Sequence, residues 1–311
     1  MANFGFVFPG QGSQSVGMLK ELSELYPVIK NTFAEASEVL GYDLFDLVMN
    51  GPAEELGKTY KTQPALLTAS VALYRLWQEK SSLKPAVMAG HSLGEYSALV
   101  CAGVIDFKDA VKLVKLRGEF MQAAVPAGVG AMAAVIGLAD EVVIKACAEA
   151  AGSQVCSAVN FNSPGQVVIA GNKEAVDKAS EALKAAGAKR VLPLAVSVPS
   201  HCALMKSAAD ELAKELAKVE FRVPSVPVIN NVDVAKVTDA DSIRDALVRQ
   251  LYSPVRWVET VQSASAEGIK TMIEVGPGKV LSGLIKRIDK EVNAISLNDA
   301  ATLDAALAAV A

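Results

Sequence analysis

Residues 85–103 read PAVMAGHSLGEYSALVCAG. The apolar run at 85–89 is typical of a short buried strand, and the segment 95–102 has helical periodicity that ends at Gly103, a common C-terminal cap. The five residues between them spell G-x-S-x-G. In a strand–turn–helix context this pattern places a serine on a sharp, exposed turn. This stretch therefore predicts an α/β fold with a reactive serine at the edge of its sheet.

The close packing of the backbone at this turn explains its two glycines and the exposure of its serine. Gly90 and Gly94 flank the serine because neighbouring backbone leaves room only for hydrogen side chains. The turn lifts the Ser92 hydroxyl from the sheet and directs a helix N-terminus at it, so the Leu93 N–H can hold a developing oxyanion. The alternative is a glycine-rich turn without activity.

A serine hydroxyl needs a base to act as a nucleophile, and the chain has two histidines. His91 is adjacent to Ser92 and projects to another side, so we expect a packing or hydrogen-bonding role beneath the turn. His201 is then the candidate base. Cys202 beside it is a poor nucleophile candidate, because adjacent side chains rarely pair in this way. The acid of a triad is left open among Asp106, Asp109, Glu119 and Asp140.

Strand-like and helix-like segments alternate along the chain, which favours an α/β architecture. Outside the middle of the chain, the predicted strands are 5–8, 85–89, 226–230 and 271–275, and the predicted helices are 63–80, 95–102, 107–124, 204–218, 239–251 and 257–267. The middle reads strand 129–136, helix 140–151, strands 154–160 and 166–170, helix 173–186 and strand 189–194. That β-α-β-β-α-β order is ferredoxin-like. We predict one α/β domain from 1–126 and 196–311, with 127–195 inserted as a small domain.

Composition excludes several classes of protein. Of 311 residues, 51% are apolar, which is too many for a disordered chain. The net charge of −4 argues against a nucleic-acid binder. The longest uncharged apolar stretch, at 127–139, is shorter than the roughly 18 residues of a membrane span. The N-terminus has no basic region of a signal peptide, and the cysteines lack CxxC spacing. A cytoplasmic protein with neither metal site nor membrane association is expected.

Several motifs together resemble the malonyl-CoA:acyl carrier protein transacylases, over about residues 3–298. They are the segments 8–14 (FPGQGSQ), 63–65 (QPA), 90–95 (GHSLGE), 117–118 (RG), 160–165 (NFNSPG), 200–201 (SH) and 274–278 (EVGPG). Taken together they are far more specific than G-x-S-x-G alone. The resemblance implies a hydrolase-like α/β domain with a ferredoxin-like insertion, which agrees with the division above.

The resemblance also implies roles for individual residues. Ser92 is similar to the nucleophile that carries the acyl group, and His201 to its base. The main-chain N–H groups of Gln11 and Leu93 resemble an oxyanion hole.

Three further residues correspond to the substrate pocket and its support. The main-chain carbonyl of Gln250 resembles the group that orients the histidine, Arg117 the cation that pairs with the malonyl carboxylate, and Gln63 a residue beside the same pocket. On sequence alone Arg117 is typical of a solvated helix residue. Transfer of a dicarboxylic acyl group, however, needs a cation, and a guanidinium fits a carboxylate in a bidentate way.

The implied reaction is ping-pong malonyl transfer from a coenzyme A thioester to the phosphopantetheine thiol of an acidic acyl carrier protein. It needs no cofactor, and the absence of fused synthase domains favours fatty acid biosynthesis. One rival is a thioesterase or lipase-like hydrolase that uses the same Ser92 and His201; such an enzyme has no need of Arg117. The other rival is a non-catalytic interaction domain.

Overall fold

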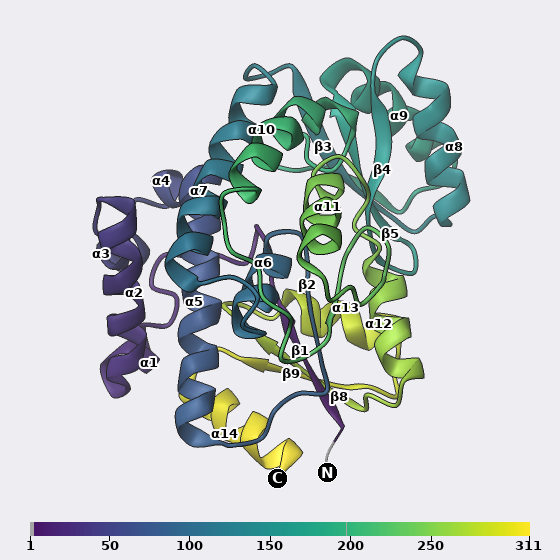
Figure 1. Ribbon diagram of the computed structural model, residues 1–311. Coiled ribbons are helices and arrows are strands. Elements are labelled where there is room, and N and C mark those ends of the chain that lie inside the picture. The colour runs from purple at the N-terminus through teal and green to yellow at the C-terminus, as the bar shows by residue number, and fades with distance from the viewer. Residues whose placement is uncertain (1–2, 197) are drawn as a thin grey trace.

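The computed structural model describes residues 3–196 and 198–311, and within these ranges it contains two separate β-sheets (Figure 1). The larger sheet is parallel, with the strand order β7-β2-β1-β8-β9. Its strands are β1 (Phe4–Phe8), β2 (Val87–Gly90), β7 (Val228–Ile229), β8 (Thr271–Val275) and β9 (Asn293–Leu297). Because the carboxyl ends of parallel strands lie at one edge, the loops after β1 and β2 meet there.

The helices outside the unit of the smaller sheet are α1 (Lys20–Leu25), α2 (Pro27–Leu40), α3 (Leu44–Asn50), α4 (Ala53–Leu56), α5 (Thr59–Lys80), α6 (Leu93–Cys101), α7 (Phe107–Ala124), α10 (Lys206–Leu216), α11 (Ala240–Gln250), α12 (Trp257–Ala266), α13 (Val280–Ile288) and α14 (Ala300–Val310). Helices α5 and α6 pack on one face of the larger sheet, and α12 and α13 pack on the other. A short 3₁₀ turn, η1 (Ala203–Met205), precedes α10.

Strand β1 is buried on both sides, and its alternating side chains enter two different cores. Phe4, Phe6 and Phe8 face the core that contains α5, where the rings of Phe6 and Trp77 lie 5.2 Å apart. Val7 faces the opposite core, formed with α12 and α13. A buried parallel strand of this kind reads as a continuous apolar run, as the sequence of β1 does.

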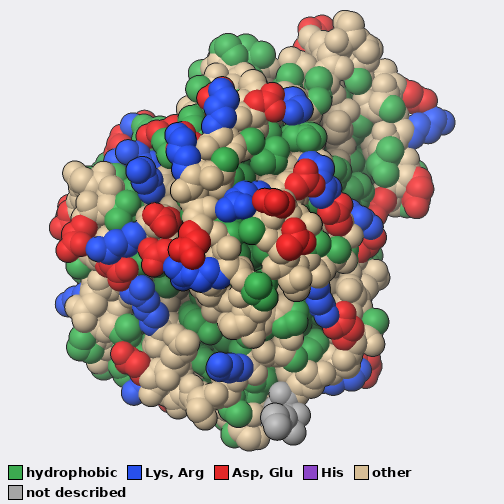
Figure 2. Space-filling view, viewed as in Figure 1, with side chains coloured by type: hydrophobic (Ala, Val, Ile, Leu, Met, Phe, Trp, Pro, Cys, Tyr) green, Lys and Arg blue, Asp and Glu red, His purple; other side chains and the backbone are tan. Residues whose placement is uncertain are grey.

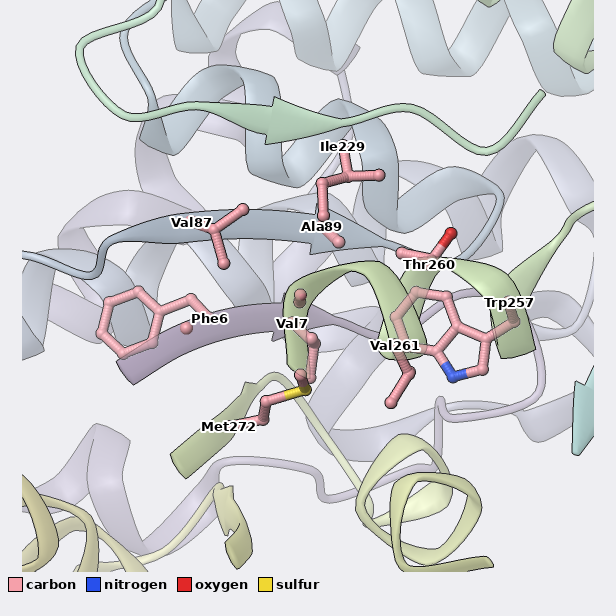
Figure 3. A pocket seen from close by; sticks show the side chains of 11 residues that line it. Phe6, Val7, Val87, Ala89, Ile229, Trp257, Thr260, Val261 and Met272 are labelled. Carbon is pink, nitrogen blue, oxygen red and sulfur yellow. The ribbon is translucent and has the colours of Figure 1, made fainter. Parts of the chain in front are cut away.

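The second core is closed. Val7, Ala89 and Ile229 of the sheet pack against Trp257 and Val261 of α12 (Figure 3). The cavity among these side chains measures about 10 Å³, the room of about one water molecule. This face of the sheet is packing rather than a binding site.

The smaller sheet is antiparallel, with the order β4-β5-β3-β6. Its elements follow in the order β3 (Gly130–Ile136), α8 (Asp140–Ala151), β4 (Cys156–Ser163), β5 (Gln166–Asn172), α9 (Lys173–Ala185) and β6 (Arg190–Pro193). The predicted α/β fold class with a ferredoxin-like β-α-β-β-α-β unit is confirmed. The predicted domain boundaries include Met1, Ala2 and Ser197, which lie outside the described residues.

A two-way backbone contact joins the smaller sheet to the larger part of the molecule. Val255, just before α12, donates its N–H to the Val159 carbonyl and accepts from the N–H of Phe161. Strand β4 is thereby held beside the chain that leads into α12, as the arrangement in Figure 1 shows. This contact fixes the position of β4 over the edge at which β1 and β2 end.

Some predicted elements differ from the structure. Helix α5 begins at Thr59, four residues before the predicted start at Gln63, and continues through Pro64. Because proline is typical of the first turn of a helix, Pro64 favours a predicted start near Gln63, which is later than the observed start at Thr59. Strand β7 covers only Val228–Ile229 of the predicted 226–230, since Pro227 has no N–H to donate to a neighbouring strand.

Two regions hold elements that the sequence analysis does not predict. Residues 20–56 form α1–α4, and residues 280–310 form α13, β9 and α14. Helices α1 and α4 have six and four residues, too short for a helical period to emerge. Their buried faces become apparent only in the folded chain, where α1 packs on α2 and α4 packs on α5.

The charged side chains are of mixed sign over the face shown in Figure 2. Many form ion pairs three or four residues apart on a helix, such as Lys214 with Glu211 on α10 and Lys173 with Asp177 on α9. In the ranges that the structure describes, no helix is both long enough and apolar enough to cross a membrane.

Candidate active site

Ser92 lies on a strained turn between β2 and α6, with φ 51° and ψ −110°. The turn is packed too tightly for side chains at its flanking glycines. A Cβ on Gly90 would lie 1.9 Å from the Gly94 carbonyl, and a Cβ on Gly94 would lie 2.0 Å from the carbonyl oxygen of Phe8. The two glycines are therefore required by close approach of the backbone, and the turn rests on the end of β1.

His201 approaches Ser92 from the chain that follows the smaller sheet. Its Nε2 lies 2.7 Å from the Ser92 Oγ, and its Nδ1 lies 2.8 Å from the main-chain oxygen of Gln250. A carbonyl only accepts, so Nδ1 carries the proton and Nε2 is free to accept from the serine hydroxyl. The main-chain carbonyl holds the ring in the tautomer that a general base needs.

The four carboxylates left open in the sequence are not the groups placed against the Nδ1 of His201. Asp106, for example, accepts the N–H of Lys108 at the start of α7. Burial, together with the positive charge of Arg117, lowers the pKa of His201 to about 3. The imidazole is therefore neutral at physiological pH, as a proton acceptor must be.

Arg117 is buried, with 1% of its surface exposed, although it belongs to the surface-like sequence Lys-Leu-Arg-Gly-Glu. Its Nη1 donates to the Gln63 Oε1 at 2.7 Å, and its Nη2 donates to the Gln250 Oε1 at 3.0 Å and to the Ser92 Oγ at 3.3 Å. The guanidinium also lies over the ring of Tyr96, 5.4 Å from its centroid. Burial lowers the pKa of Arg117, which still leaves a guanidinium protonated.

The predicted oxyanion groups lie around the same serine. Leu93 is the first residue of α6, and the first N–H groups of a helix have no partner within the helix. The N–H of Ser92, by contrast, donates to the Asn231 Oδ1 at 2.8 Å. Gln11, in the loop after β1, lines the cavity with Leu93. The geometry therefore offers the Leu93 N–H, rather than that of Ser92, to an oxyanion.

His91 makes contacts of a different kind. Its Nε2 lies 2.8 Å from the Asn162 Oδ1, and its ring lies 5.6 Å from the Trp257 ring. Burial lowers its pKa. These contacts agree with the expected packing and hydrogen-bonding role.

These residues surround a cavity of about 410 Å³ between the two sheets. The larger part of the molecule contributes Ser92, Leu93 and Arg117, and the smaller sheet contributes Met132 and Asn160. A cavity of this size is in the range of sites for small molecules. The Cys101, Cys147, Cys156 and Cys202 side chains are buried free thiols. Across the described residues, no three His, Cys, Asp or Glu side chains are grouped so as to hold a metal ion.

Two polar residues at the site escape the sequence analysis as functional candidates. Glu95 is buried beneath the turn, and its Oε2 accepts from the main-chain N–H of Asn231 and from the Gln250 Nε2, each at 2.9 Å. An acid within an otherwise apolar helix is a signal that could have identified Glu95. Asn231 has no such signal, since it becomes important only where its loop meets the turn.

A serine on a strained strand-to-helix turn, paired with a neutral histidine beside a buried cation, defines a serine-dependent enzyme that acts on acyl groups. A family model of the acyl transferase domain matches residues 5–303. The chain belongs to this acyl transferase family.

The chain also has close relatives and structural neighbours. It is 66% identical to the malonyl CoA-acyl carrier protein transacylase of Escherichia coli K12, over 99% of both chains. The crystal structure of an acyl carrier protein S-malonyltransferase from Vibrio cholerae is 66% identical, with a TM-score of 0.96 over 98% of this chain and all of that one. A malonyl-transacylase solved in complex with a type II PKS acyl carrier protein is 62% identical, with a TM-score of 0.98 over 99% and 100% of the two chains.

Proposed function

We propose that the protein transfers a malonyl group from malonyl-CoA to the phosphopantetheine thiol of an acyl carrier protein, through an ester on Ser92. The observation that carries the proposal is the 2.7 Å contact between Ser92 Oγ and His201 Nε2, beside the buried guanidinium of Arg117. The relatives of 66% identity named for this activity support the same substrate pair.

In the first half-reaction, His201 Nε2 takes the Ser92 proton as Oγ attacks the thioester carbonyl. The negative charge that develops on the carbonyl oxygen accepts hydrogen bonds from the N–H of Leu93 and, in our proposal, from that of Gln11. When the tetrahedral intermediate collapses, the C–S bond breaks. The leaving coenzyme A thiolate takes the proton from His201, and Ser92 keeps the malonyl group as an ester.

The second half-reaction reverses these roles. The thiol of the carrier's phosphopantetheine gives its proton to His201 and attacks the ester carbonyl of Ser92. The C–O bond then breaks, and the proton returns from His201 to Oγ. One thioester is consumed and one is formed, so no net proton or electron is required.

Arg117 supplies the selection for a dicarboxylic acyl group in this proposal. A malonyl carboxylate lies one methylene beyond the ester carbonyl, and Arg117 Nη2 is 3.3 Å from the oxygen that carries the ester. The guanidinium can therefore bind the carboxylate while Ser92 holds the acyl carbon. Gln63 and Gln250 hold the guanidinium in this position.

The proposed steps use only groups of the protein, with malonyl-CoA as a substrate rather than a cofactor. We assign the reaction to fatty acid biosynthesis, where a malonyl-carrier thioester is the extender, and to the cytoplasm.

The test is an intact-mass measurement after incubation with malonyl-CoA. We expect a stable adduct of one malonyl group on the wild type and none on Ser92→Ala, which loses only a hydroxyl. Addition of an acyl carrier protein should then discharge the adduct to malonyl-carrier. Steady release of free malonate instead would identify a hydrolase, and an adduct on another residue of Ser92→Ala would exclude Ser92 as the nucleophile.

A further inference from the structure

Glu95 is a buried carboxylate that the proposed mechanism does not use. It is the third residue of α6 and has 2% of its surface exposed. A buried charge is costly unless hydrogen bonds or a counter-charge stabilise it. One oxygen, Oε2, accepts two N–H groups from distant parts of the chain, the main-chain N–H of Asn231 and the side-chain amide of Gln250.

The contact between Glu95 and Gln250 determines which way the Gln250 amide points. Oε2 of Glu95 accepts the main-chain N–H of Asn231, so it is an acceptor oxygen and the amide nitrogen of Gln250 faces it. The same nitrogen donates to the Ser92 carbonyl at 3.0 Å, and the amide oxygen is thereby turned toward Arg117, whose Nη2 donates to it at 3.0 Å. With the amide reversed, its NH₂ group would face the guanidinium and the hydrogen bond would be lost.

The contact between Glu95 and Asn231 supports the turn that carries the proposed nucleophile. Asn231 donates its main-chain N–H to Glu95, accepts the Ser92 N–H through Oδ1 and donates through Nδ2 to the Gly90 carbonyl at 2.6 Å. It therefore contacts the turn on both sides of His91. A strained turn persists only where its surroundings over-determine it.

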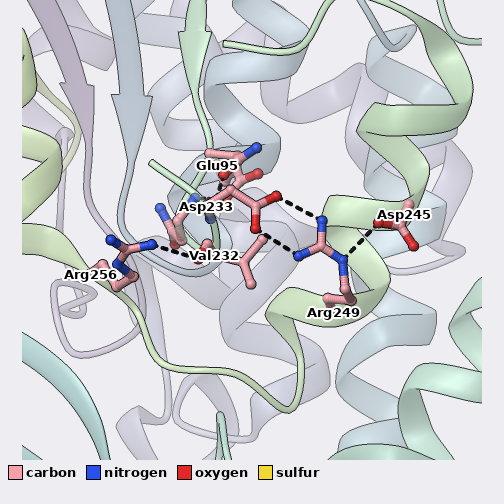
Figure 4. A network of polar contacts seen from close by, with 8 residues as sticks. Glu95, Val232, Asp233, Asp245, Arg249 and Arg256 are labelled. Atoms are coloured by element: carbon pink, nitrogen blue, oxygen red, sulfur yellow. Dashed lines mark hydrogen bonds and ion pairs between the residues drawn. The ribbon is translucent and has the colours of Figure 1, made fainter. Parts of the chain in front are cut away.

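An ion pair between Arg249 and Asp233 also holds the loop 230–233 in place. Arg249 donates in a bidentate manner to Asp233, at 2.8 and 2.7 Å, and through Nε to Asp245 (Figure 4). Arg249 precedes Gln250 at the end of α11, so the loop and the end of the helix are tied together. Figure 4 shows the carboxylate of Asp233 facing the guanidinium of Arg249.

We propose that Glu95 is a positioning residue for malonyl transfer, which orients the Gln250 amide so that Arg117 is held toward the acyl site and braces Asn231 under the Ser92 turn. The proposal rests on the function proposed above. Glu95 itself does not touch the substrate, since its contacts run through Gln250 and Asn231. Removal of its carboxylate should therefore change the choice of substrate, in addition to the rate.

The test compares Ser92 acylation by malonyl-CoA and acetyl-CoA in Glu95→Ala and Glu95→Gln. In Glu95→Ala we expect the ratio of kcat/KM for malonyl over acetyl to fall by about tenfold or more, because Arg117 loses its orientation. In Glu95→Gln the side-chain carbonyl can accept both N–H groups, so the ratio should stay within about threefold of the wild type. An equal loss in both variants would overturn the proposal.

Glu274 provides the matched control. It is likewise a buried acid, and it accepts the N–H groups of Leu281 and Ser282 at the start of α13. Glu274→Ala should lower the thermal midpoint and leave the malonyl-to-acetyl ratio unchanged. A purely structural role for Glu95 predicts the same pattern in Glu95→Ala, and that result would also overturn the proposal.

If Glu95→Ala does not fold, Gln250→Met tests the link through which Glu95 acts, because it removes the amide that contacts both Glu95 and Arg117 and keeps the main-chain carbonyl that holds His201. The malonyl-to-acetyl ratio should fall as far as expected for Glu95→Ala, and a ratio equal to that of the wild type would overturn the inference. Malonylation of the wild-type protein separates this inference from the proposed function on which it rests. A wild type that is not malonylated contradicts the proposed function, whereas a malonylated wild type with unselective variants supports both.

Discussion

The guanidinium of Arg117 lies 3.3 Å from the hydroxyl oxygen of Ser92, measured from Nη2 to Oγ. The same Nη2 is held by Gln250, whose main-chain carbonyl orients His201. In the proposed function, substrate choice and nucleophile activation therefore depend on one connected set of hydrogen bonds. A change at one of these residues is therefore expected to affect the others.

Arg117→Ala should lose malonyl transfer and gain relative activity toward acetyl-CoA. Two charge-assisted hydrogen bonds to the malonyl carboxylate stabilise the complex by about 1.5–3 kcal/mol each. With acetyl bound, a buried cation faces no partner charge. The preference should therefore fall by more than about a hundredfold, measured as kcat/KM for both thioesters.

Lysine at this position is the matched variant, because it keeps the charge and loses the planar fork. Arg117→Lys should recover only part of the malonyl preference. If Arg117→Ala retained the wild-type preference, the arginine would play no part in selecting the dicarboxylic acyl group.

His201→Ala should lower the rate of Ser92 acylation by about 10²–10⁴-fold, because the hydroxyl loses its proton acceptor. His91→Ala is the control, since its Nε2 bonds to Asn162 instead of Ser92. Quenched-flow sampling with intact-mass detection gives the acylation rates. A larger loss in His91→Ala than in His201→Ala would reverse the assignment of the base.

The pH dependence of stability should report on Glu95. Burial raises the pKa of Glu95 from 4.5 to about 7, although Arg117 and two hydrogen bonds oppose the shift and Asp233 adds to it. The folded protein therefore binds more protons than the unfolded chain between these values, and stability falls as pH rises through them. The shift corresponds to about 3 kcal/mol. The thermal midpoint of Glu95→Gln, relative to wild type, should rise between pH 4.5 and pH 8.

His201→Ala gives the control of opposite sign. The pKa of His201 is lowered from 6.5 to about 3, so the unfolded chain binds more protons in that window and the wild type loses stability as pH falls. The midpoint of His201→Ala relative to wild type should therefore rise toward acidic pH. A Glu95→Gln difference that is flat across pH 4.5–8 would contradict a raised pKa at Glu95.

The docking of the acidic carrier protein should depend on a local basic surface, because the chain carries a net charge of −4. Lys286 and Arg287 are exposed on α13. Their reversal to Glu should raise the KM for the carrier protein and leave acylation by malonyl-CoA nearly unchanged.

The control for the docking surface is the same charge change on α1 and α2, at Lys20 and Lys30, which lie across the molecule from α13 in Figure 1. This variant should leave the KM for the carrier protein unchanged. Equal effects of the Lys286 and Arg287 reversal on both half-reactions would refute this surface. Lys189 and Arg190, exposed at the start of β6, are the second candidate pair.

The sequence predicts the pair Ser92 and His201 because each has a strong local or compositional signal, a G-x-S-x-G turn in one case and a scarcity of histidines in the other. Arg117 also has a signal in its local sequence. It follows Val114 by three residues and precedes Met121 by four, so it falls on the buried stripe of α7. Helical periodicity alone could have predicted its burial.

The support of the site could not be predicted in this way. The group that holds His201 is the main-chain carbonyl of Gln250, and every residue type carries a carbonyl. Asn231 meets Ser92 across 139 positions of sequence, in a loop after a two-residue strand. Such contacts are created by the strand order of the sheet, and they leave no pattern in the local sequence.

The backbone angles of Ser92 and His201 carry an evolutionary consequence. Ser92 has φ 51° and His201 has φ 65°, and strained backbone of this kind costs a non-glycine residue about 1–3 kcal/mol. Glycine at either position would relieve this cost and abolish the chemistry. Selection for thermal stability alone would favour glycine at both positions. Selection for the proposed activity must instead retain the serine and the histidine. The fold therefore operates below its attainable stability at the two residues to which we assign the chemistry.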